Sequence, residues 1–151
     1  CYAHELVANI LLPYIDRVAM SALTVMHPWR NASEEDKAQF VEKYTYKVID
    51  DYSSAMTDYT NERVEILPLR KSDYIDKSRV KVQSMIKGGR VDIPVEYRVK
   101  RSNGEWRIYD LVVNNISMVR SYRVQFKEVI AKEGLGGLVN KLDKLNHRDC
   151  N

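Results

Sequence analysis

The sequence predicts an α+β fold, with helices packed on one face of a curved, four-stranded antiparallel sheet. Three observations support it: helical spacing at both ends of the chain, strict alternation in the middle, and turn sequences between the alternating segments. With 151 residues, of which 44% are hydrophobic and 30% charged, the chain is long enough for one core and too short for two. We therefore expect residues 1–151 to form a single domain.

The first third of the sequence predicts helices. Residues 2–12 form a helical stretch that Pro13 ends, and residues 14–26 resume the same spacing. Ser33 begins the best-defined helix, because its hydroxyl can cap the backbone and three acidic residues follow it. The apolar face of this helix consists of Val41, Tyr44, Val48, Tyr52, Ala55 and Tyr59.

The middle of the chain has a period of two, which is typical of strands. The candidate strands are residues 64–69, 79–86, 91–100 and 106–113. The turn sequences KGGR and SNGE separate the last three of them. The third candidate alternates apolar residues with charged residues and one proline, so we expect one packed face and one face in water.

The end of the chain predicts two more helices, over residues 117–133 and 134–146. The first follows directly on the last strand, through the sequence Asn114-Asn115-Ile116-Ser117, which contains no glycine. Asparagine is the best substitute for glycine where a turn requires a positive φ, and a serine can cap the helix that follows. We therefore expect a tight strand-to-helix corner here.

The composition argues against several classes of function. The net charge of +3 comes from basic residues interspersed with acidic ones, whereas nucleic-acid binders more often carry a basic stripe. The three histidines have no metal-site spacing, and no nucleotide-binding, hydrolase or metalloprotease motif is present. No apolar run approaches the about 18 residues of a membrane span. We expect no nucleic-acid partner, no metal and no cofactor.

Asp110 is a charged residue inside an otherwise apolar strand. One interpretation is a general base in a pocket, as in small α+β isomerases. The other is a structural ion pair or cap, with Arg123 as the partner across the corner, because buried charges are normally paired.

Apolar surface is abundant on the predicted sheet and on the helices that face it, and the chain has 10 tyrosines against 2 phenylalanines. Tyrosines can line an amphipathic cavity while their hydroxyl groups stay near water. Composition alone also fits an ordinary packed core. A cavity and a solid core therefore both remain open.

Four blocks of sequence resemble the MlaC family, also called the toluene-tolerance or Ttg2-type family, of bacterial periplasmic phospholipid carriers. The most recognisable block comprises Trp106, the pair Tyr109-Asp110, the corner Asn115-Ile116-Ser117 and the segment from Tyr122 to Phe126. The others are LLPYID at 11–16, WRNASEEDKAQF at 29–40 and GLGGLVNKL at 134–142. They occur in the family's order over nearly the whole chain.

The sequence also departs from the family pattern. Asn115 and Met26 stand where the family has glycine. Family members carry another helix before the point where this chain begins, so the chain is either trimmed or a short member.

The resemblance implies a soluble periplasmic carrier, not an enzyme, that encloses phospholipid acyl chains in an apolar cavity and shuttles lipid between the outer and inner membranes. It would thereby maintain outer-membrane lipid asymmetry. Its cargo would be phospholipid, without a cofactor. The implied partners are the MCE-domain subunit of an inner-membrane ABC transporter and an outer-membrane lipoprotein–porin complex, and the carrier itself would be a monomer.

The residues expected to line the cavity come from both the helices and the sheet. They are Tyr44, Val48, Tyr52, Val82, Val95, Tyr97, Val99, Ile108, Val119, Tyr122 and Phe126. The residues expected to build the corner are Trp106, Asp110, Asn115, Ser117 and Arg123.

Other functions remain open from the sequence. The cargo could be a hopanoid or another lipid, the protein could be a small pocket enzyme with Asp110 as base, or it could be a packed adaptor without a cavity. The two cysteines, Cys1 and Cys150, lie at opposite ends. Because the termini of a domain often lie close together, they either form a disulfide or remain free thiols.

Overall fold

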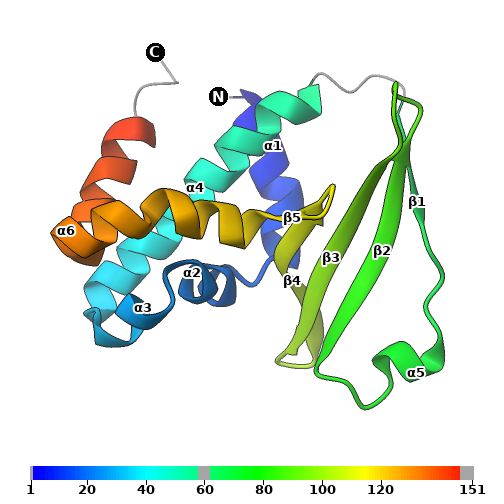
Figure 1. The fold of residues 1–151 in the computed structure, drawn as a ribbon, viewed down its shortest axis with the longest axis horizontal. Helices are drawn as coiled ribbons and strands as arrows, with labels where there is room; N and C mark the ends of the chain where they lie inside the picture. The colour runs from blue at the N-terminus through cyan, green and yellow to red at the C-terminus, as the bar shows by residue number, and fades with distance from the viewer. Residues whose placement is uncertain (1, 58–61, 147–151) are drawn as a thin grey trace.

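The computed structural model describes residues 2–57 and 62–146 and shows an α+β fold (Figure 1). Its helical elements are α1 (Tyr2–Leu11), η1 (Leu12–Tyr14), α2 (Arg17–Val25), α3 (His27–Asn31), α4 (Glu34–Thr57), α5 (Lys71–Tyr74) and α6 (Met118–Asn146). The backbone amide of Asp36 donates to the Ser33 hydroxyl, which confirms the predicted cap of α4. The predicted cysteine pair lies outside the described residues.

A five-stranded antiparallel sheet follows α4 in the chain. Its strands are β1 (Arg63–Ile66), β2 (Arg79–Lys87), β3 (Ile93–Ser102), β4 (Glu105–Val113) and β5 (Ile116–Ser117). They lie side by side in sequence order, and each strand pairs with the next. Residues 67–78, which include α5, connect β1 to β2, and the later strands follow one another by shorter turns. The sheet is curved and does not close on itself (Figure 1).

The helices meet the sheet along one edge. The contacts of η1, α2 and α6 with the sheet are made mainly to β4 and β5, and Ile15 forms an isolated parallel bridge with Ile108 of β4. In Figure 1 the helices other than the short α5 gather on the β4 side, and β1 and β2 lie farthest from them; α5 lies by the far strands and contacts β2. The sheet therefore has one edge anchored in the helical layer and another that extends away from it.

The hydrophobic core lies in the helical layer. Residues of α2, α4 and α6 form one buried cluster, with Phe40 and Tyr44 0% exposed and Leu142 1% exposed. The long α6 reaches across this core because it changes direction at Gly134, whose φ of 71° suits glycine. The break confirms that residues 117–146 form two helical pieces.

The predicted fold class is confirmed, and the structure corrects several details. The sheet has five strands instead of four, because Ile116 and Ser117 of the corner pair with Val113 and Val112. Residues 27–31 and 71–74 are short helices that the sequence analysis did not predict. The first strand ends at Ile66, three residues before its predicted end.

Candidate functional site

One face of the sheet is largely apolar across its width, with the buried Ser84 as a polar residue within it. The pairing of Val82 with Tyr97, and of Tyr97 with Leu111, places these side chains on the same side of three neighbouring strands. We call this side the apolar face. It comprises Val64, Ile66, Val80, Val82, Ile86, Ile93, Val95, Tyr97, Val99, Ile108, Leu111 and Val113.

Burial on the apolar face falls towards the free edge of the sheet. Val80 and Val95 are 6% and 5% exposed, and Val82, Tyr97 and Val99 are half-buried. On β1, Val64 is 54% and Ile66 67% exposed. The face is thus only partly covered, and its β1 residues leave aliphatic side chains in contact with water.

A small apolar cavity lies where the apolar face meets the helices. Its volume is about 70 Å³, enough for about two water molecules, so it does not have room for an acyl chain in this conformation. Its wall is formed by Val7, Leu11, Ile15, Met20, Val48, Ile49, Tyr52, Ile108, Asp110, Leu111 and Met118. Ile108 and Leu111 belong to both the cavity and the apolar face, so the two are continuous.

The structure divides the predicted lining residues into two groups. Val82, Val95, Tyr97, Val99 and Ile108 lie on the apolar face, as above. Tyr44, Val48, Val119, Tyr122 and Phe126 belong to the packed cluster of the helical layer, with Tyr52 packed against it. Only Val48, Tyr52 and Ile108 line the small cavity.

The aromatic residues of the helical group pack tightly on one another. The Phe40 and Tyr44 rings stack with centroids 5.1 Å apart, and Tyr122 meets Tyr44 edge to face at 5.3 Å. The Tyr44 hydroxyl accepts from Thr24, and that of Tyr122 donates to Asp51. Burial raises the pKa of both tyrosines well above the usual value, and for Tyr122 the bond to Asp51 adds to the effect.

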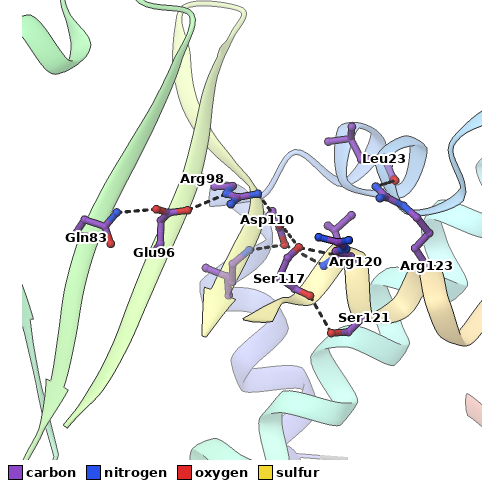
Figure 2. A network of polar contacts seen from close by, with 11 residues as sticks. Leu23, Gln83, Glu96, Arg98, Asp110, Ser117, Arg120, Ser121 and Arg123 are labelled. Carbon is purple, nitrogen blue, oxygen red and sulfur yellow. Dashed lines mark hydrogen bonds and ion pairs between the residues drawn. The ribbon is translucent and has the colours of Figure 1, made fainter. Parts of the chain in front are cut away.

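Asp110 is the centre of the strand-to-helix corner (Figure 2). One carboxylate oxygen accepts from the backbone amides of Leu111 (2.8 Å) and Val119 (3.0 Å), and the other accepts from the Ser117 hydroxyl. The Ser117 hydroxyl in turn accepts from the backbone amide of Arg120 at 3.1 Å, which confirms the predicted cap of α6. Asp110 therefore fastens β4 to the first turn of α6.

The ion pair of Asp110 corrects the predicted partner. Arg98 on the neighbouring strand lies 3.7 Å from the Asp110 carboxylate, whereas Arg123 donates to the backbone carbonyl of Leu23 at 2.7 Å. Arg98 also pairs with Glu96 at 2.9 Å. Burial acts to raise the pKa of Glu96, but hydrogen bonds from Arg98 and Gln83 outweigh it and hold that pKa below its usual value.

The remaining corner residues have separate positions. Asn115 has a φ of 67°, so it occupies the positive-φ conformation for which asparagine substitutes best. Trp106 is not at the corner: it lies at the opposite end of β4, where the Arg101 guanidinium stacks 4.8 Å from its ring centroid. Met26, between α2 and α3, also has a positive φ of 60°.

Several residues of the site escaped the sequence analysis. Val64 and Ile66 extend the apolar face onto β1, and the alternation in RVEI was the signal for them. Val7, Leu11 and Ile49 line the cavity from α1 and α4. Their helical spacing was visible, but it did not show which of the apolar helix positions would face the sheet.

The described part of the chain offers little for catalysis. Among residues 2–57 and 62–146, no group of three or more His, Cys, Asp or Glu side chains could hold a metal ion. Both oxygens of Asp110 already accept hydrogen bonds from the corner, so its geometry is that of a structural carboxylate.

None of the described helices has the length and hydropathy that a membrane span requires.

The family model and the similar proteins all point to the same family. The family model described as "MlaC protein" matches residues 2–144. The intermembrane phospholipid transport system binding protein MlaC of Haemophilus influenzae is 22% identical over 95% of this chain, which spans 68% of that protein. Toluene tolerance protein Ttg2D of Pseudomonas putida is 26% identical over 93% of this chain, which spans 63% of that protein.

A solved structure shares the fold. The phospholipid-binding protein from Ralstonia solanacearum, determined in complex with a phospholipid, superposes with a TM-score of 0.85 and 27% identity. The similarity covers 96% of this chain and 80% of that chain. Because the family model matches almost the entire described chain, this protein belongs to the MlaC family.

Proposed function

We propose that the protein binds a phospholipid by its acyl chains and carries it between the outer and inner membranes. The observation that supports this most is the apolar face, on which Val82, Tyr97 and Val99 are half-buried and the β1 residues exposed, and which continues into an apolar cavity. The Ralstonia relative, which shares this fold, was solved with a phospholipid. In the proposed complex the acyl chains lie against the apolar face and the head group remains at the open side.

The physical task of such a carrier is to replace bilayer hydrocarbon. A diacyl lipid has about 30 methylene-type groups at about 0.8 kcal/mol each, so transfer through water costs on the order of 20 kcal/mol. A wall of aliphatic side chains removes most of that cost without bond making or breaking. This requirement agrees with a site that has many valines and isoleucines.

The predicted lining residues receive two roles in this proposal. Val48, Tyr52, Val82, Val95, Tyr97, Val99 and Ile108 contact the acyl chains. Tyr44, Val119, Tyr122 and Phe126 support that wall from within the helical layer, because they are 0–5% exposed in a packed cluster. For the cavity to hold acyl chains, its volume must grow beyond the present 70 Å³ as α1 and α4 separate from the apolar face.

The finer parts of the proposal come from the family. The relatives are named for intermembrane phospholipid transport and for toluene tolerance. We propose a periplasmic location, loading and unloading at an MCE-domain subunit of an ABC transporter and at an outer-membrane lipoprotein–porin complex, and a role in outer-membrane lipid asymmetry.

The first experiment is native mass spectrometry of the protein purified from a bacterial periplasm, followed by extraction of its cargo. Adduct masses that resolve into phospholipids support the proposal. A hopanoid would replace phospholipid as the cargo and overturn the proposed pathway. A ligand-free mass with no uptake from phospholipid vesicles would mean that the apolar face carries no lipid.

A pair of neighbouring variants tests the proposed wall. Val82→Glu places a charge on the apolar face, whereas Lys81→Gln changes the net charge equally on the opposite face of the same strand. We expect Val82→Glu to lose most of its bound phospholipid and to keep its far-ultraviolet circular dichroism, and Lys81→Gln to keep both. Full lipid occupancy in folded Val82→Glu would contradict this choice of wall.

A further inference from the structure

A second, wider hollow of the described structure lies away from the small apolar cavity. It is an open groove of about 690 Å³ between the sheet, the corner and the first turns of α6. Four arginines line it, Arg79 and Arg98 from the sheet and Arg120 and Arg123 from α6, with Asp110 as the single acidic residue among the lining side chains. Figure 2 shows Arg98 and Arg120 around Asp110, with Arg123 turned towards Leu23. We call it the arginine groove.

Three of these arginines have no carboxylate partner among the described residues. Arg79 stacks on the Tyr109 ring, with its guanidinium carbon 5.4 Å from the centroid. Arg123 donates to a backbone carbonyl, and its Nε is buried without an acceptor in the described structure. Arg120 is exposed and only its backbone amide is engaged. Guanidinium groups without a carboxylate partner favour an anionic ligand, and so does the buried Nε–H of Arg123, which has no acceptor in the described structure.

The arginine groove and the apolar face are on opposite sides of β4, and Asp110 borders both the groove and the small cavity. Successive strand residues point to opposite faces, and Leu111 lines the apolar cavity while the next residue, Val112, lines the groove. A ligand in the groove would therefore leave the proposed lipid wall free. This inference goes beyond lipid carriage and does not depend on it.

The shape and rim of the groove indicate which anion fits. Its floor is partly recessed, since the side chain of Arg98 is 33% exposed, so a flat membrane surface would contact the exposed Arg120 more readily than Arg98. Its rim carries two aliphatic side chains, Ile116 at 64% and Val124 at 72% exposed. A small inorganic anion would leave the Ile116 and Val124 side chains in water. A peptide with acidic and aliphatic side chains would cover these two side chains and also pair with the guanidinium groups.

We propose that the arginine groove is a docking site for an acidic, aliphatic segment of a partner protein. Glutamate or aspartate side chains of that segment pair with Arg79, Arg120 and Arg123. Its aliphatic side chains pack on Ile116 and Val124. The affinity of the isolated segment should fall steeply with added salt, because exposed charge pairs are screened.

The test uses ¹⁵N-resolved NMR of the protein with a capped peptide of alternating glutamate and leucine as the probe. We expect saturable shifts confined to residues around the groove, and no binding of the matched glutamine–leucine peptide. Arg120→Glu should weaken the glutamate peptide about tenfold or more. This variant should fold well, because a glutamate three residues after the Ser117 cap completes a favourable helix start.

Arg90→Glu is the matched control, because it makes the same charge change in an exposed turn outside the groove. It should leave peptide affinity unchanged. Equal weakening in Arg90→Glu, equal binding of the glutamine peptide, or no shifts at the groove would overturn the proposal. Two further probes complete the test: groove shifts with inorganic phosphate but not with the peptide would indicate a small-anion site, and shifts only with phosphatidylglycerol vesicles would indicate a membrane surface. Either result overturns peptide docking.

Discussion

The molecule contains two apolar regions that differ in how completely they are packed. In the helical layer, Phe40, Tyr44, Tyr122 and Phe126 contact one another and are 0–5% exposed. On the apolar face, Val82, Tyr97 and Val99 are only half-buried and the β1 residues are mostly exposed. The first region is closed by its own side chains, whereas the second is only partly covered and becomes exposed at β1.

This difference in packing indicates that one region contributes mainly to the stability of the fold and the other to ligand binding. A closed aromatic cluster contributes to folding because every member is removed from water by another. An open apolar face contributes less to folding, and it keeps apolar surface available for a ligand. We infer that the helical layer holds the fold while the apolar face serves the cargo, and the predictions below test that division.

The largest expected effect comes from truncating one aromatic residue in each region. Phe126→Ala should lower the free energy of unfolding by about 3–5 kcal/mol, because it opens a cavity in the packed cluster. Tyr97→Ala should lower it by only about 1 kcal/mol, because that side chain is half-buried. Urea denaturation of delipidated protein measures both. Equal losses would mean that the apolar face is packed as tightly as the core in solution.

An intermediate effect is expected at the corner that joins the two regions. Asp110→Asn removes the charge that accepts from two backbone amides and the Ser117 hydroxyl, so we expect a loss of about 1–3 kcal/mol in unfolding free energy. Phospholipid extracted per folded protein should stay unchanged, with Asp92→Asn, an exposed turn residue, as the control. If the variant were fully stable, the corner bonds would not hold the sheet to α6.

The smallest effect concerns Met26 and Asn115, two of the exposed residues with a positive φ. Met26→Gly should stabilise the protein by about 1 kcal/mol, because glycine adopts a φ of 60° without strain and Met26 is 54% exposed. Asn115→Gly should gain less, because asparagine tolerates its φ of 67°. Thermal denaturation compares the two. A lower melting temperature for Met26→Gly would mean that its side chain makes a contact that outweighs the strain.

Local sequence patterns were enough to predict the fold class and much of the corner. The hydroxyl caps at Ser33 and Ser117 follow from residues within one helical turn, and the alternation in residues 91–100 follows from the pleat of a strand. The positive φ of Asn115 follows from the chemistry of a tight turn. These features depend on neighbours in sequence, and a sequence contains that information directly.

Long-range features were predicted less well. The sequence placed Tyr44 and Tyr122 beside Val82 and Tyr97 in one wall, whereas the structure packs the tyrosines inside the helical layer. It paired Asp110 with Arg123, yet the partner is Arg98 on the adjacent strand. Both assignments depended on which faces of separate elements meet, and periodicity defines a face without naming the face opposite it.

By itself, the sequence determined the types and order of the principal elements, the apolar side of the strands at 79–86 and 91–100, and the family to which the four blocks point. Only the tertiary structure decided that the helices meet the sheet mainly at β4, that the apolar face becomes exposed at β1, and that four arginines from distant segments share one groove. The physical reason is that secondary structure arises from interactions within a few residues. Open surfaces and charge clusters depend on how whole elements pack, and that packing is decided by the sum of many weak, long-range contacts.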